Sequence, residues 1–231
     1  MAGVAEIAAE AVGSVGTGSN GEGDVVTGEE NSLRAKARPG KRGEYNIGPM
    51  VVLAIETVTR AGSLALWDGS VCHARAGEPV RTHAERLPGE LIDWLAVHGR
   101  TLADVDLLVV VTGPGSFTGM RIGIAAVQGL ALAAHKRVRG VPTLQALAGA
   151  WQLGHPSPAL VAACLDGQRG EVFVAGYRVG GESLVDATAE VLPAMVETPE
   201  VAGDRIAQAA AAQHVVVVGD GAERYLSLIH I

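Results

Sequence analysis

A near-continuous apolar run, LLVVVT at Leu107 to Thr112, constrains the fold more than any other feature of this sequence. The run passes directly into the glycine-rich GPGSFTG and then into the helical pattern GMRIGIAAVQGLALAAH. A strand that is apolar at nearly every position is usually covered by helices on both faces of its sheet. A strand, a glycine loop and a helix in this order therefore predict an α/β fold.

Further strands surround this unit. Residues 51–56, 63–67 and 71–74 are apolar segments separated by turn residues, and we expect three consecutive antiparallel strands. Another short strand is expected around Val138 to Val141. The first half of the chain then has the order β-β-β-α-β-α-β-α, which predicts a mixed sheet with helices.

The helices of this half follow from periodicity. Leu87, Leu91 and Leu95 recur every four residues and predict an amphipathic helix that stops at Gly99. The helix after the glycine loop carries the small residues Gly123, Ala126, Gly129 and Ala133, which let another helix approach closely. Packing within the chain and packing against a partner both fit this pattern.

The second half repeats the opening of the first. Strands are expected at 160–166 and 171–178, a helix within 197–213, and a strand with a glycine turn from His214. We therefore predict two lobes, at 49–153 and 154–231, the second of them incomplete. Residues 1–48 are rich in Gly, Ala, Ser and Glu without periodicity, and are predicted to be a disordered extension or linker.

Composition excludes several functions. A net charge of −7 and a pI near 5.5 argue against a stand-alone nucleic-acid binder, so any RNA contact would be shared with a partner. No signal peptide or apolar run of membrane-spanning length is evident, and a cytoplasmic location without membrane contact is expected. The seven histidines are scattered, and neither a metal site nor a covalent nucleophile is predicted.

Two glycine segments are candidate phosphate or nucleotide loops, because a glycine turn beside a helix start can bind anions. The first lacks the P-loop lysine and also fails GxGxxG, so a tight structural turn is the favoured interpretation, with Thr118 as a plausible helix N-cap. In the second, Asp220 is expected to cap the helix that follows. The candidate residues are Gly113, Gly115, Ser116, Thr118, Gly119, Gly219, Asp220 and Gly221.

Glu56 and Asp166 end the first strands of the two halves. Two carboxylates in equivalent positions can share a cleft and hold a hydrated metal, but carboxylates at strand ends also cap turns. The sequence leaves both interpretations open.

The segments LAIETVTRAGSLAL, HAERLPGELIDWL, VVVTGPGSFTGMRIGIAAVQGLALA, VRGVPTLQALA and CLDGQRGEVFVAGY together resemble the TsaB (YeaZ) family, over residues 51–225. The resemblance implies an actin-like ATPase (ASKHA) fold of two β-β-β-α-β-α lobes. Two departures are the Glu56 that stands where the family usually has aspartate, and a chain that stops where the family continues.

The resemblance also implies a function. The family member is a non-catalytic subunit that pairs with TsaD, which transfers threonylcarbamoyl to adenosine 37 of tRNAs reading ANN codons. TsaE joins the pair, TsaC makes the activated intermediate, tRNA binds only through the complex, and ATP or ADP can sit at its interface. The catalytic relative has a metal-binding histidine pair where this chain has Thr143 and Leu147, so no catalytic or metal-ligating residue is expected here.

By the same resemblance, two helices of the first lobe form the partner interface, through Leu87, Leu91, Leu95, Arg121, Ile122, Ala125, Gly129 and Leu132. A homodimer in the absence of the partner is left open. The rival hypotheses are a nucleotide-binding ATPase or glycoprotease-like enzyme of the same fold, and a tRNA-binding module that uses the basic run RAKARPGKR at 34–42.

Overall fold

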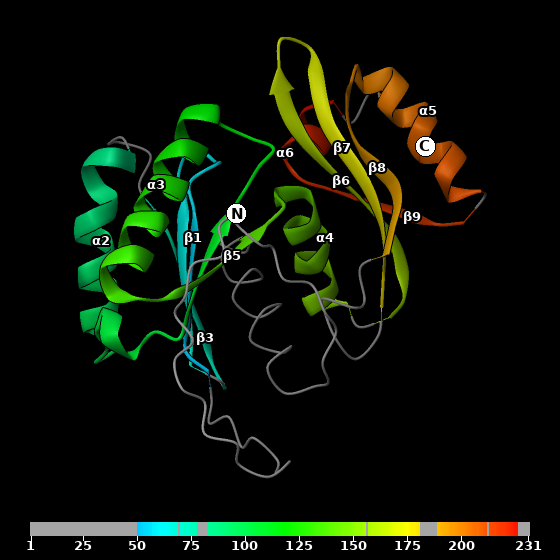
Figure 1. Cartoon of the computed structure of the whole chain (residues 1–231). Helices are drawn as coiled ribbons and strands as arrows, with labels where there is room; N and C mark the ends of the chain where they lie inside the picture. The colour runs from blue at the N-terminus through cyan, green and yellow to red at the C-terminus, as the bar shows by residue number, and fades with distance from the viewer. Residues whose placement is uncertain are drawn as a thin grey trace, which may run out of the picture.

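A computed structural model describes residues 50–68, 70–77, 83–155, 157–180, 189–211 and 213–225. Residues 1–48, predicted to be an extension or linker, lie outside the described residues. Within them the chain forms two sheets with helices (Figure 1).

The first sheet has the strand order β3-β2-β1-β4-β5. Strands β1, β2 and β3 are antiparallel, as predicted, while β4 and β5 run parallel to β1. All residues of β1 and β4 are buried, because helices cover both faces of the centre of the sheet. The strands are β1 (Val52–Glu56), β2 (Ser63–Trp67), β3 (Cys72–Ala76), β4 (Leu107–Val111) and β5 (Arg137–Val141).

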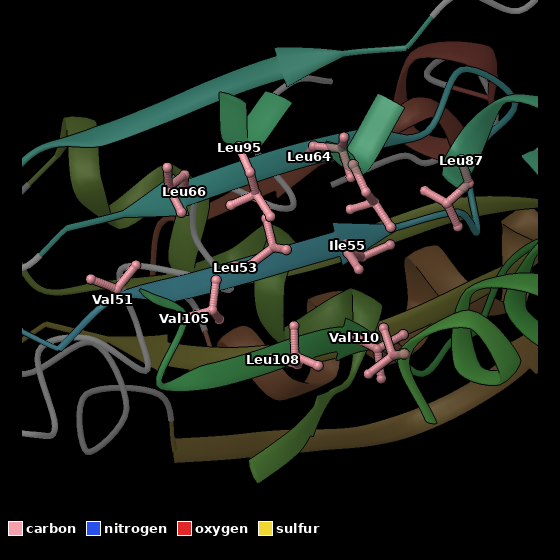
Figure 2. Close-up of a cluster of buried hydrophobic side chains, with 12 residues drawn as sticks. Val51, Leu53, Ile55, Leu64, Leu66, Leu87, Leu95, Val105, Leu108 and Val110 are labelled. Carbon is pink, nitrogen blue, oxygen red and sulfur yellow. The ribbon is translucent and has the colours of Figure 1, made fainter. Parts of the chain in front are cut away.

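Helices α2 (His83–Val97) and α3 (Phe117–Ala134) lie side by side on one face of this sheet, and the short 3-10 helix η2 (Leu102–Asp104) follows α2. Figure 2 shows Leu87 and Leu95 of α2 among the side chains of the strands. This apolar cluster also includes Leu53, Ile55, Leu64, Leu66, Leu91, Leu108 and Val110. The predicted amphipathic helix is confirmed, and its leucine face is the face that packs on the sheet.

The second sheet has the order β8-β7-β6-β9, with β6 antiparallel to β7 and parallel to β9. Its β-β-β-α-β-α order matches the start of the first half, which confirms the predicted α/β fold and its internal repeat. The elements are β6 (Ala159–Gln168), β7 (Glu171–Val179), β8 (Ala189–Glu197), α5 (Pro199–Ala210), β9 (Val215–Val218) and α6 (Asp220–Tyr225).

Strand β8 is not predicted by the sequence pattern of the second half, although the β-β-β-α-β-α plan requires it. Its sequence, AEVLPAMVE, contains Pro193 and charged ends, which hide the period-2 pattern of an ordinary strand. The strand is at the edge of the sheet, where proline is tolerated.

Helix α4 (Thr143–Gly154) lies between the two sheets (Figure 1). Ala146 belongs to the apolar cluster of the first sheet, whereas Leu144 and Ala148 belong to the cluster on the second sheet. The helix therefore packs with two faces into two cores.

Candidate functional site

The first glycine loop joins β4 to α3. Ser116 is the N-cap of α3, and its Oγ accepts a hydrogen bond from the Gly119 N–H at 3.1 Å. The prediction that Thr118 caps this helix is wrong, because the helix begins one residue before it, at Phe117. The loop also reaches α4, since the Gly113 carbonyl accepts a bond from the Thr143 N–H at 2.8 Å.

The glycines of this loop allow α3 to approach the turn after β1. A Cβ on Gly119 would overlap the Thr57 carbonyl oxygen, and a Cβ on Gly115, whose φ is +147°, would lie 2.8 Å from Val58 Cβ. Thr57 Oγ1 donates a hydrogen bond of 2.7 Å to the Gly119 carbonyl. Gly123 takes part in the same close approach, because a Cβ added at this position would overlap Thr57 Oγ1. These contacts are those of a tight structural turn.

Glu56 is buried, with 1% of its surface exposed, at the end of β1. Its carboxylate accepts hydrogen bonds from the Thr59 N–H at 2.6 Å, from Thr59 Oγ1 at 2.8 Å and from Ser63 Oγ at 3.1 Å. A buried carboxylate that accepts three such bonds holds a turn together. Of the two interpretations left open by the sequence, these bonds fit the capping role.

The second glycine turn packs on β6. A Cβ on Gly219 would overlap the Cys164 carbonyl oxygen, and a Cβ on Gly221 would lie 2.7 Å from the Leu165 carbonyl carbon. Asp220 Oδ1 accepts a hydrogen bond from the Asp166 N–H at 3.0 Å, so its carboxylate ties α6 to β6 instead of capping α6 as expected. Close packing again explains the glycines.

Asp166 has its own partners. Its carboxylate accepts hydrogen bonds from the Gln168 N–H at 3.0 Å and from the Arg224 guanidinium.

Cys164 lies next to the second glycine turn. Burial, together with the nearby charges of Asp220 and Asp166, raises the pKa of the Cys164 thiol to about 12, so this cysteine stays protonated and unreactive at neutral pH. Among the described residues, no group of three or more His, Cys, Asp or Glu could hold a metal ion.

A polar network that the sequence analysis did not identify joins α2 to the first sheet, around a small pocket that Glu56 and Arg75 also line. Arg86 donates to Glu90 at 3.0 Å and to the Ala61 carbonyl, and lies 2.8 Å from His83 Nδ1. Arg86 and Glu90 are spaced i, i+4, which is the one signal in the sequence for this pairing.

The predicted interface residues fall into two groups. Leu87, Leu91 and Leu95 are 4–5% exposed and pack into the core of the first lobe. The prediction that they contact a partner is therefore wrong: the apolar face of α2 is used by its own sheet. Ile122 is half-buried against the same core. The remaining predicted residues, Arg121, Ala125, Gly129 and Leu132, are exposed along α3.

Helices α2 and α3 also carry exposed apolar side chains, which the structure distinguishes from the buried side chains of the same helices. They are Ile92 (71% exposed) and Val97 (77%) on α2, and Phe117 (60%) and Leu132 (79%) on α3. We call these four residues, with Ala125 and Gly129 between them, the α2–α3 face. The two helices contact each other, and exposed large apolar side chains on neighbouring helices are a common feature of interaction surfaces.

Helix α3 is long and apolar enough to cross a membrane by length and composition, with a mean hydropathy of 1.4 over 18 residues, of which 17% are buried. The same helix contacts α2, β1, β4 and β5 as one layer of the α/β fold. It is an apolar helix that packs on a sheet with one side and is exposed on the other.

Comparisons with known proteins identify the family. A family model described as TsaD, tRNA N6-adenosine threonylcarbamoyltransferase, matches residues 77–225, more than half of the chain. The tRNA threonylcarbamoyladenosine biosynthesis protein TsaB of Escherichia coli is 42% identical over 130 residues, which cover 56% of this chain and 55% of the relative. A Mycobacterium tuberculosis protein is 36% identical over 172 residues, covering 72% of this chain and 74% of the relative.

The matched part spans about half the length of the Escherichia coli relative. Among solved structures, YeaZ from Pseudomonas aeruginosa superposes with a TM-score of 0.66 at 30% sequence identity, covering 79% of this chain and 81% of that chain. The chain therefore belongs to the TsaB (YeaZ) family, within the wider family that the TsaD model describes, and has an actin-like ATPase fold.

Proposed function

We propose that this chain is the non-catalytic subunit that pairs with TsaD in the complex that installs N6-threonylcarbamoyl on adenosine 37 of tRNAs reading ANN codons. In this proposal TsaE joins the pair, TsaC supplies the activated threonylcarbamoyl group, ATP or ADP binds at the interface of the complex, and the reaction takes place in the cytoplasm. The family relationship and the names of the TsaB relatives in Escherichia coli and Haemophilus influenzae support this role.

The α2–α3 face is the structural observation that supports the proposed pairing with TsaD. Its four large side chains are between 60% and 79% exposed on helices whose opposite sides are buried in the core. Leaving such side chains in water costs about 25 cal/mol per Å² of apolar surface. A partner that covered both helices could bury the roughly 1,200–2,000 Å² of total surface that stable protein complexes bury.

A supporting role without catalysis fits the contacts of the polar groups. Glu56 and Asp166 are held by hydrogen bonds from their own lobes, and the loop glycines pack on Thr57 and Val58. Leu147, which stands where the resemblance would place a metal ligand, packs against both cores. These residues maintain the fold, so we assign the transfer chemistry to TsaD.

The test is complex formation with TsaD from the same source, followed by size-exclusion chromatography with light scattering. We expect a stable complex with the natural chain, and at least about 30-fold weaker binding with Ile92→Asp/Leu132→Asp, because two apolar contacts of about 1 kcal/mol or more would be replaced by buried charges. Leu91→Asp would be unsuitable, since it would place a carboxylate in the core.

The matched control is Val196→Asp, which changes an exposed valine of strand β8 in the second lobe and should leave binding unchanged. Equal binding of the α2–α3 face variant and the control would reject this surface as the interface. If the natural chain forms no complex with TsaD, the proposed function itself is wrong. A complex of two copies of this chain, lost in the same variant, would identify a homodimer on the same surface.

A further inference from the structure

Strand β5, at one end of the first sheet, carries two exposed arginines. Among the described strands β5 pairs only with β4, so its other side is an open edge. Arg137 and Arg139 are exposed and, being two residues apart in a strand, lie on the same face. Lys136 directly precedes them, and we call these three residues the basic edge.

The described structure does not neutralise this charge. Lys136 Nζ donates to the Ala103 carbonyl at 2.7 Å, and the Arg137 guanidinium lies 3.8 Å from Met50 Sδ. The ion pairs between described residues involve other arginines: Arg75 and Arg86 with Glu90, and Arg224 with Asp166.

One carboxylate lies near enough to interact with Lys136. This is Asp104, which also accepts hydrogen bonds of 2.8 Å from the Thr101 N–H and hydroxyl. It forms no ion pair with the basic edge among the described residues. The guanidinium groups of Arg137 and Arg139 are therefore available to an external anion.

We propose that the basic edge contacts the phosphate backbone of tRNA, an inference that rests on the proposed function. A chain with a net charge of −7 repels a polyanion on average, so favourable contact requires a local group of cations. Guanidinium groups bind phosphate oxygens with two parallel hydrogen bonds, and the unpaired N–H groups of an edge strand are further donors.

A second basic feature of the sequence precedes the described residues. The run RAKARPGKR has five cations and no acidic residue at positions 34–42, and the chain enters the first lobe at Met50, beside Arg137. The run itself lies outside the described residues, and the proposed contact is made by the basic edge.

Charged side chains on an edge strand also prevent aggregation through that edge, and this role alone would require no RNA. The two explanations differ in the predicted salt dependence of RNA binding: only phosphate contact by these arginines makes the affinity depend on salt through them. Each phosphate contact releases a counterion, so that log K falls with log salt by about 0.9 per contact for a duplex.

The experiment measures binding of a tRNA that reads an ANN codon to the complex of this chain with TsaD, by fluorescence anisotropy over a series of salt concentrations. We expect Arg137→Gln/Arg139→Gln to weaken binding about tenfold at low salt and to reduce the salt slope by about 2. The matched control, Arg178→Gln/Arg205→Gln, removes two exposed arginines from the second lobe and should match the natural chain.

Equal affinity and equal slope for the two variants would overturn the inference and leave edge protection as the explanation. If this chain does not pair with TsaD, the proposed function is wrong. The same salt titration of tRNA binding is then carried out with the chain alone, and it tests the basic edge independently of TsaD. Salt-dependent binding that only the basic-edge variant loses would then support it. Absence of tRNA binding by the natural chain in both settings would overturn it.

Discussion

Glycines at the start of α3 set how closely this helix approaches the turn after β1. The Gly119 N–H donates to Ser116 Oγ and its carbonyl accepts from Thr57 Oγ1, while its missing side chain leaves room for the Thr57 carbonyl. Gly129, ten residues further along the same helix, has no atom within 4 Å of the position of an added Cβ apart from its chain neighbours and the backbone of its own helix. Adding a methyl group at these two positions is therefore expected to change stability in opposite directions.

We predict that Gly119→Ala destabilises the chain by about 2 kcal/mol or more, because the added methyl forces α3 away from Thr57 and strains a buried hydrogen bond. Gly129→Ala should instead stabilise it by about 0.5–1 kcal/mol, since alanine is the better helix former and the site is open. Urea unfolding of both variants measures the difference. Similar stabilities for the two variants would contradict the packing role assigned to Gly119.

At the scale of elements, aromatic contacts join the edge strand β3 to the end of α2. The His73 and His98 rings stack with centroids 4.3 Å apart, and Trp94 meets His98 edge-on at 4.4 Å. Arg75 lies over the Trp94 ring and forms an ion pair with Glu90 at 3.4 Å. Burial of His98 in this contact opposes protonation of its ring.

This contact predicts a loss of stability in mild acid. Burial, and secondly the charge of His73, lower the pKa of His98 below its ordinary 6.5, and its Nε2 is buried without a described partner. As the pH falls through 6.5, the unfolded chain binds a proton at this position that the folded chain does not bind. Stability that is fully present above pH 6.5 is therefore lost as the pH falls toward the lowered pKa of the folded state.

Melting temperatures between pH 7.5 and 5 measure this effect. His98→Phe keeps an aromatic ring on Trp94 but removes the titrating group, and should flatten the pH dependence. His155→Phe is the matched control, since the His155 ring also contacts a tryptophan ring, that of Trp151, but is exposed. The assignment is wrong if His98→Phe leaves the pH profile unchanged.

At the scale of the whole molecule, α4 couples the two lobes. Leu144, 1% exposed, is among the largest fully buried side chains and packs with Val161 and Ala163 of β6. Ala146, two residues later, contacts the core of the first sheet. Because α4 contributes side chains to both cores, unfolding of one lobe would expose apolar side chains of the other.

We expect Leu144→Ala to destabilise the chain by about 2–5 kcal/mol, the usual cost of a large cavity in a core. Both lobes should still unfold in one transition, because α4 belongs to both. Far-ultraviolet circular dichroism and tryptophan fluorescence, which reports Trp67 and Trp94 of the first lobe and Trp151 of α4, should give the same midpoint. Separate midpoints would show that the lobes unfold independently.

Most of the elements were predictable because their signals are local. The apolar runs of β1 and β4, the four-residue spacing of Leu87, Leu91 and Leu95, and the glycine loop between β4 and α3 all correspond to the observed elements. Strand β8 was the exception, because an edge strand with a proline has little pattern of its own. The motif GPGSFTGMRIG, with the segments around it, was also sufficient to indicate the family.

What the sequence alone determined is therefore the α/β class, the repeated strand order and the family, since these depend on periodicity and on residues that are neighbours in the chain. Only the tertiary structure decided which apolar residues of α2 face the core and which face outward, because both groups are apolar and the sheet buries one side only. It also showed that the loop glycines make room for Thr57 and Val58, an approach between segments about sixty residues apart that no local pattern records.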